Sequence, residues 1–126
     1  MHDRELTLGI LRQILDAARC IGERFAAIQT PNDFVNSPAG KEKLDAICLP
    51  LSAIGESLKK IDKITGGALL AQYPAIDWKG AKATRDIIVH GYFDIDEEIV
   101  FDICRNLLPP LIETIRTMIR DQDAQI

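Results

Sequence analysis

The sequence predicts an all-α protein, an antiparallel bundle of four to five helices that forms one domain over residues 1–126. Three observations predict this class. Apolar residues recur at steps of three and four over four long segments, which is the period of an α-helix. Glycine and proline residues punctuate the pattern between these segments. No run of alternating apolar and polar residues occurs with hairpin turns, so a sheet protein is not expected.

The first predicted helix covers residues 3–28. It closes near the letters IQTPND, where Thr30 and Pro31 form a typical N-cap and first-turn pair for a short helix through Phe34 and Val35. The apolar positions of the long helix, with charged residues between them, are Leu8, Leu11, Leu15, Ala18, Cys20 or Ile21, and Phe25.

The second predicted helix covers residues 39–64, and Ser37 with Pro38 is its start signal. Pro50 lies inside it. We expect a kink or a bend there, because proline has no backbone N–H and collides with the preceding turn. Two glycines and a proline in ITGGALLAQYP end the pattern. The apolar residues form a strict seam suited to packing along another helix, namely Leu44, Ile47, Leu51, Ile54, Leu58 and Ile61.

The third predicted helix covers residues 77–90 and contains most of the stretch RDIIVHGYF. Asp77 is suited to the N-cap. Gly91 is suited to the position after the helix, where a left-handed conformation ends a helix without strain. The β-branched residues of this stretch would also suit a strand in isolation. The caps and the length of the periodic pattern favour a helix.

The fourth predicted helix follows the turn YFDID, where Asp94 and Glu97 resemble a capping box. Pro109 and Pro110 interrupt its pattern, so we expect a kink or a split at that point. Its apolar positions are Ile99, Val100, Ile103, Leu107, Leu111, Ile115 and Ile119.

The composition is that of a globular protein with a slightly acidic surface. Hydrophobic residues make up 47% of the chain and charged residues 27%, with a net charge of −4 and a pI near 5.1. A nucleic acid would therefore bind a local cationic patch and not the whole surface. The chain begins with acidic residues and no apolar run, and no stretch is long enough to span a bilayer. We expect a cytoplasmic protein with no membrane attachment.

Cysteine and metal chemistry are not indicated. Cys20, Cys48 and Cys104 are widely spaced among apolar residues, and we expect small buried thiols in a reducing compartment. No cluster of histidine, cysteine, aspartate and glutamate has the spacing of metal ligands, so we expect neither a metal nor another cofactor.

The candidate chemistry lies at the end of the third predicted helix. His90 is the only well-placed group that titrates near neutrality, and a helix C-terminus favours its protonated form. Asp86 shares its helix face and could orient the imidazole or form an ordinary surface pair. Arg85 lies about 140° around the helix from His90, so one helix does not aim both side chains at one point. A second copy across a two-fold axis would bring a second arginine and histidine to the same groove.

The order of these residues carries a family resemblance. Arg85, His90 and Tyr92 match the RX4HXY motif, and the chain resembles the HepT-like toxins of the HEPN superfamily. The letters IGES at 54–57 resemble the family's IGEA-like segment. The run from YPAIDW to HGYF resembles its P-x-I-x-W segment followed by the motif helix, and NLLPPLIETI resembles its closing helix. These segments cover most of the chain from about residue 44 onward.

The resemblance implies a HEPN-like helical homodimer with its active site at the two-fold interface and with endoribonuclease activity that needs no metal. We assign Arg85 as the phosphate binder and His90 as the general acid and base, with Asp86 orienting the imidazole. The resemblance further implies the toxin of a HepT/MntA-type toxin–antitoxin system. Its partner would be an MntA-like minimal nucleotidyltransferase antitoxin, which inactivates the nuclease by transferring AMP to Tyr92.

Other interpretations stay open from the sequence. The chain could be a non-catalytic helical HEPN subunit that binds nucleotide or substrate for a partner nucleotidyltransferase, because a fold does not determine a function. It could also be a dimerisation module in which Arg85 and His90 only cap a helix, with Tyr92 as an aromatic anchor of the turn. Glu56 is expected to cap or pair more than to act near the site.

Overall fold

The computed structural model describes residues 2–89 and 91–124, and within them it contains helices and no strand. The predicted all-α class is therefore confirmed. No helix in these two ranges is long and apolar enough to cross a membrane. The α-helices are α1 (His2–Phe25), α2 (Pro38–Thr65), α3 (Ala68–Ala71), α4 (Trp78–Val89), α5 (Glu97–Asp102) and α6 (Leu108–Ala124). Between them lie the 3₁₀ turns η1 (Pro31–Phe34) and η2 (Tyr92–Asp94) and the π-helical segment η3 (Ile103–Leu107).

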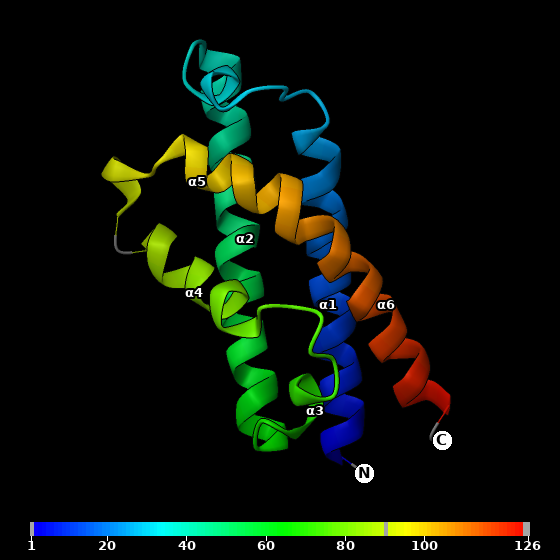
Figure 1. Ribbon diagram of the computed structural model, residues 1–126. Coiled ribbons are helices and arrows are strands. Elements are labelled where there is room, and N and C mark those ends of the chain that lie inside the picture. Colours follow the sequence, from blue (N-terminus) through cyan, green and yellow to red (C-terminus); the bar gives the residue numbers. More distant parts are fainter. Residues whose placement is uncertain (1, 90, 125–126) are drawn as a thin grey trace.

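Two long antiparallel helices form the frame of the molecule. In Figure 1, α1 and α2 run side by side, α4 packs against α2, and α6 runs along α1 from the continuous path of α5 and η3. The short η2 turn projects from the α4 side of the bundle. In the described residues, α4 packs on α2, and η2 contacts α2 through Tyr92.

The predicted seam of α2 faces the core. Ile47, Leu51, Ile54, Leu58 and Ile61 are each at most 2% exposed, and Leu44 packs at the edge of the same cluster. The other helices add their own apolar stripes at the helical period. From α1 and α6 these are Leu11, Ile14, Ala18, Ile21, Leu111, Ile115 and Met118.

The N-terminal caps follow the sequence. The Ser37 hydroxyl accepts a hydrogen bond from the Gly40 N–H at 3.0 Å, and the Asp77 carboxylate accepts one from the Gly80 N–H at 3.1 Å. These bonds satisfy N–H groups that the first turn of a helix leaves without partners.

One side chain, that of Asp33 in the short helix η1, bonds to the backbone between the end of α1 and η1. The Asp33 carboxylate accepts hydrogen bonds from the backbone N–H groups of Gln29 and Thr30, at 2.8 and 3.1 Å. Because those donors are used by η1, they are not available to extend α1, which ends at Phe25 and not at residue 28. These contacts lower the pKa of Asp33, the Gln29 bond most strongly.

Two predicted caps are wrong. Gly91 has a φ of −143°, so it is not in the left-handed region that was expected to end α4. The capping residue of α5 is Asp96, whose carboxylate accepts a hydrogen bond from the Glu98 N–H at 2.9 Å, and not Asp94. Asp94 instead belongs to η2, where its N–H bonds to the Gly91 carbonyl at 2.8 Å.

The fourth predicted helix is split, but the change of geometry comes before the two prolines. Pro109 and Pro110 cannot donate to the carbonyls four residues earlier, and their rings crowd that turn. The preceding residues, Ile103–Leu107, widen into a π-helix, in which the Leu108 N–H bonds to the Ile103 carbonyl. The wider π-helical turn lets the chain continue as a helix into α6, although Pro109 and Pro110 donate no backbone hydrogen bonds.

One of the three cysteines is not buried as expected. Cys48 and Cys104 are buried, whereas Cys20 is exposed. The first helix buries Ile14, Ala18 and Ile21 on one face, and Cys20 lies about 100° around the helix from Ile21. The ambiguity between these two adjacent positions is thus resolved in favour of Ile21.

Candidate functional site

A glycine brings the motif arginine to α2. A Cβ atom at Gly55 would lie 2.9 Å from the Arg85 backbone nitrogen and 2.9 Å from the Thr84 hydroxyl. Any larger residue would therefore push α4 away from α2. The buried Thr84 hydroxyl also lies 3.4 Å from the Leu51 carbonyl of α2. The two helix backbones are in close contact at the level of Arg85.

Arg85 is held by carboxylates from two helices. Its Nε lies 3.3 Å from Glu56 Oε2 on α2, and its Nη1 donates to Asp86 Oδ1 at 3.2 Å. The arginine side chain is 36% exposed, so a ligand in solution can reach it.

Asp86 contacts cations from both helices. Besides Arg85, the Lys59 ammonium of α2 lies 3.4 Å from its carboxylate. The hydrogen bond from Arg85 and the nearby Lys59 hold the pKa of Asp86 below its usual value. Asp86 is therefore a carboxylate at neutral pH, as a residue that orients an imidazolium must be.

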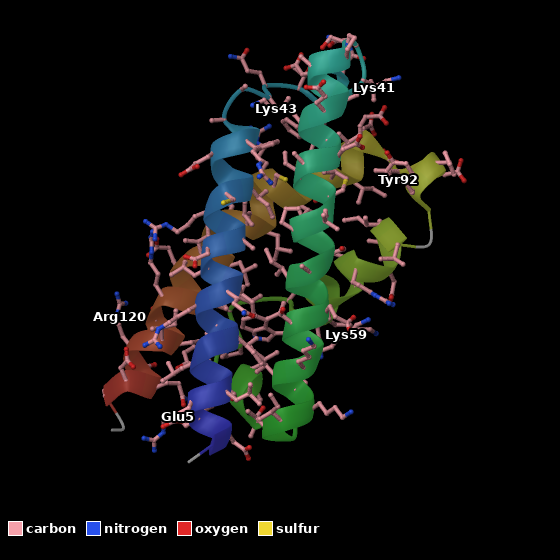
Figure 2. The ribbon with its side chains drawn as sticks, turned by 180° about the vertical axis from the view of Figure 1, so that it is seen from behind. Glu5, Lys41, Lys43, Lys59, Tyr92 and Arg120 are labelled. Atoms are coloured by element: carbon pink, nitrogen blue, oxygen red, sulfur yellow. The ribbon has the colours of Figure 1, made fainter. Side chains whose placement is uncertain are left out.

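Tyr92 contacts α2 nearer to the N-terminus of that helix than Arg85 does. Its hydroxyl donates to Asp45 Oδ1 at 3.2 Å, and the residue is 55% exposed. In Figure 2, Tyr92 lies at the edge of the molecule on the side of α2 away from α1. The hydrogen bond to Asp45 and the charge of that carboxylate raise the pKa of Tyr92. Asp45 and Glu56 are eleven residues apart, which is about 16 Å along a helix.

His90, the predicted general acid and base, lies outside the described residues. Of the other predicted site residues, the structure brings Arg85 and Asp86 together and places Tyr92 on a separate partner.

Sequence reasoning expected Glu56 to cap or pair without naming Arg85 as its partner, and it missed Asp45 and Lys59. Asp45, Glu56 and Lys59 lie on one face of this helix, at steps of eleven and three residues, next to the buried seam. Asp45 contacts Tyr92, Glu56 contacts Arg85, and Lys59 contacts Asp86. The signal was their helical spacing beside the seam, but nothing in the sequence says which helix packs there.

An apolar groove adjoins Tyr92. It has a volume of about 250 Å³ and is lined by Asp45, Cys48, Leu49, Ser52, Ile88, Val89 and Tyr92. The apolar side chains on and beside it are unusually exposed: Leu49 is 76% exposed, Val89 51%, and Phe93 96%. The Phe93 ring stands 5.5 Å from the Tyr92 ring, centre to centre. A near-fully exposed phenylalanine beside such a groove is typical of a surface that another molecule covers.

Within residues 2–89 and 91–124, no group of three or more histidine, cysteine, aspartate and glutamate side chains could hold a metal ion. A further ion pair between the two helices, Lys82 of α4 with Asp62 of α2, lies nearer the end of α2.

Comparison with known proteins identifies relatives. The family model described as Ribonuclease HepT-like matches residues 14–118. The Methanocaldococcus jannaschii protein named "Putative RNase MJ0127" is 33% identical over 85 residues, which are 68% of this chain and 67% of that protein. "Putative RNase MJ0125" from the same organism is 30% identical over 89 residues, 71% of each chain.

A third relative in that organism, "Gamma-glutamylcyclotransferase and putative RNase MJ0434", is 27% identical over 113 residues. These are 90% of this chain but 47% of that protein. No solved structure matches the chain. The family match extends over most of the sequence and includes both Arg85 and the residues of α2 that contact it. The chain therefore belongs to the HepT-like ribonuclease family.

Proposed function

We propose that this protein is the toxin of a HepT/MntA-type toxin–antitoxin system and acts as a metal-independent endoribonuclease. The observation that carries the proposal is the placement of Arg85: a partly exposed guanidinium, held by Glu56 and Asp86, in a chain of the HepT-like ribonuclease family. The family and the names of the relatives support ribonuclease activity.

The chemistry follows from the groups in the motif. RNA supplies its own nucleophile, the 2′-hydroxyl next to the scissile phosphate. His90 takes its proton and returns one to the departing 5′-oxygen, while the planar donors of Arg85 bind the phosphate oxygens as charge accumulates on them. Asp86 keeps the imidazole oriented. The products are a 2′,3′-cyclic phosphate and a free 5′-hydroxyl.

The apolar surface around Phe93 supports a homodimer as the active form. Leu49, Val89 and Phe93 expose apolar area next to the motif, and a second copy would cover it. In a two-fold dimer the same patch meets itself, so both copies of Arg85 and His90 would approach one groove. That groove would be locally cationic on an acidic protein and would suit RNA.

A cleavage assay tests the nuclease. The purified protein is incubated with RNA and excess EDTA, and RNA ends are mapped. We expect cleavage with 2′,3′-cyclic phosphate ends, and we expect Arg85→Ala and His90→Ala each to lose at least about a hundredfold in rate. Wild-type rates in both variants would refute the assignment.

The regulatory part of the proposal concerns Tyr92. Tyr92 is 55% exposed in the monomer, and its hydroxyl is hydrogen-bonded to Asp45 at the surface. An MntA-like nucleotidyltransferase would join this oxygen to the α-phosphorus of ATP and release pyrophosphate. The added phosphate and adenosine would repel and block RNA beside the cationic groove. With ATP, Mg²⁺ and the cognate antitoxin, the intact mass should rise in steps of AMP, and Tyr92→Phe should abolish the steps. An unchanged wild-type mass would remove this part of the proposal.

A further inference from the structure

The site contains a glutamate whose position requires an explanation. Glu56 comes from α2, directly after Gly55, where the backbones of α2 and α4 meet. Two contacts fix the position of α4 along the axis of α2. They are the close approach at Gly55 and the Thr84 hydroxyl near the Leu51 carbonyl. The side chain of Glu56 therefore reaches the guanidinium of Arg85. Gly55 allows the two helices to approach, and Glu56 makes the contact with the arginine.

Arg85 forms an ion pair with Glu56 and both an ion pair and a hydrogen bond with Asp86. Glu56 engages Nε at 3.3 Å, and Asp86 engages Nη1 at 3.2 Å. A guanidinium has five N–H donors in one plane. Two carboxylates beside neighbouring nitrogens restrain that plane, and no other described residue accepts a hydrogen bond from the guanidinium. The remaining edge is suited to a phosphate oxygen.

Glu56 and Asp86 do not contribute equally to this orientation. Asp86 is the neighbour of Arg85 on the same helix and is shared with Lys59, whose ammonium lies 3.4 Å and 3.5 Å from its two oxygens. Figure 2 shows Lys59 on α2. Glu56 is on the other helix, so its contact alone directly ties the guanidinium to α2. Without Glu56, Arg85 would turn toward Asp86.

The same glutamate opposes the binding of RNA. Arg85 and Lys59 carry two positive charges, and Glu56 and Asp86 carry two negative charges, so these four groups add no net charge and a positive groove would depend on His90. A phosphate approaching Arg85 is repelled by Glu56 at short range. Removing that charge should favour the binding of RNA, while removing the contact should harm the orientation that the transition state needs.

From this geometry we infer that Glu56 is a positioning residue, which holds Arg85 for phosphate contact in the transition state at the expense of RNA affinity. The inference rests on the proposed ribonuclease function and deepens it. Its distinguishing mark is that kcat and RNA affinity change in opposite directions, which a purely structural residue would not produce.

The experiment compares Glu56→Ala and Glu56→Gln with wild type on a mixed-sequence single-stranded RNA. Affinity is measured separately with the 2′-deoxy version of the same strand, which cannot be cleaved. For Glu56→Ala we expect kcat to fall about tenfold while the deoxy strand binds at least as tightly as to wild type. Glu56→Gln keeps an amide oxygen for Nε and should recover most of kcat.

A matched control is Glu113→Ala. Glu113 is also an exposed glutamate paired with an arginine, Arg116, but it lies on α6. It should leave both kcat and affinity unchanged. Thermal unfolding monitors all variants, and if Glu56→Ala does not fold, Glu56→Met, which keeps the apolar stem but has no acceptor for Arg85, carries the test through its lower kcat and undiminished binding.

The outcomes separate the two proposals. If wild type cleaves RNA, Arg85→Ala does not, and Glu56→Ala cleaves at the wild-type kcat, the role of Glu56 is overturned and the nuclease stands. Weaker binding of the deoxy strand by Glu56→Gln would also overturn it. If wild type does not cleave RNA, or Arg85→Ala cleaves normally, the proposed function itself fails.

Discussion

At the scale of the residue, burial and contact with a carboxylate raise the pKa values of cysteine and tyrosine side chains and so lower their reactivity at neutral pH. Burial raises the pKa of Cys48 to about 11, with a further contribution from Asp45, and burial raises the pKa of Cys104 to about 12, with a further contribution from Cys48. A raised pKa means less thiolate, which is the reactive form. At pH 8 the buried thiols should be ionised only to about one part in a thousand or less.

We therefore predict one fast thiol in the native protein. An aromatic disulfide reagent at pH 8 should modify Cys20, the exposed cysteine, within minutes, and the other two only after unfolding in guanidinium. Cys20→Ser should remove the fast phase. Two or three fast equivalents in the native protein would contradict the burial of Cys48 and Cys104.

The two tyrosines provide a pH test of the site. The Asp45 contact raises the pKa of Tyr92, while burial and the hydrogen bond to Asp121 raise the pKa of Tyr73 to about 12. Both phenols should thus ionise at higher pH than free tyrosine. In a spectrophotometric titration, Asp45→Asn should let one of the two tyrosines ionise earlier, near its ordinary pKa of about 10. Circular dichroism should show that the helices persist over the same pH range. An unchanged titration would show that Asp45 does not hold Tyr92.

At the scale of the element, α2 depends on a residue of α1. Pro50 lies within α2 and has no N–H for the carbonyl of Ala46, four residues earlier. The Arg24 guanidinium of α1 donates to that carbonyl at 2.6 Å. An arginine from the neighbouring helix therefore replaces the bond that the proline removes. The predicted bend at Pro50 stays a prediction, but α2 remains one helix through this residue.

A double-mutant cycle tests this replacement. Arg24→Met keeps the apolar stem and should lower the free energy of unfolding by about 1–2 kcal/mol, measured by urea denaturation. In a Pro50→Ala background the new backbone N–H at this position can bond to the Ala46 carbonyl, so the same arginine substitution should be nearly neutral. Arg19→Met, an exposed arginine on the same helix, is the control. Equal losses in both backgrounds would show that Arg24 acts elsewhere.

At the scale of the whole molecule, the exposed surface beside α4 predicts association. Phe93 and Leu49 are 96% and 76% exposed next to the groove. We expect Phe93→Asp and Leu49→Asp to shift sedimentation equilibrium from dimer to monomer and to reduce RNA cleavage in parallel. Leu6→Asp is a matched control, because Leu6 is also exposed but lines a groove between α1 and α2. Dimers that persist in both Phe93→Asp and Leu49→Asp would place the interface on another face.

The sequence by itself determined the helical class, the buried seam of α2, and the caps at Ser37 and Asp77. These depend on residue period and on contacts within a few positions, which a single chain segment carries. It also placed Arg85 and Asp86 on one helix. The sequence left Cys20 and Ile21 undecided and misplaced the caps at Gly91 and Asp94, because the outcome there depends on which neighbouring group takes each bond.

Only the tertiary structure decided which groups meet across helices. Asp45, Glu56 and Lys59 are ordinary charged positions in the sequence, and they contact the motif segment because Gly55 lets α4 lie directly on α2. Arg24 reaches Ala46 for a similar reason, since α1 and α2 run side by side. Such contacts join residues far apart in the chain. They depend on the distance and the rotation between two packed helices, and the period of one helix contains neither quantity.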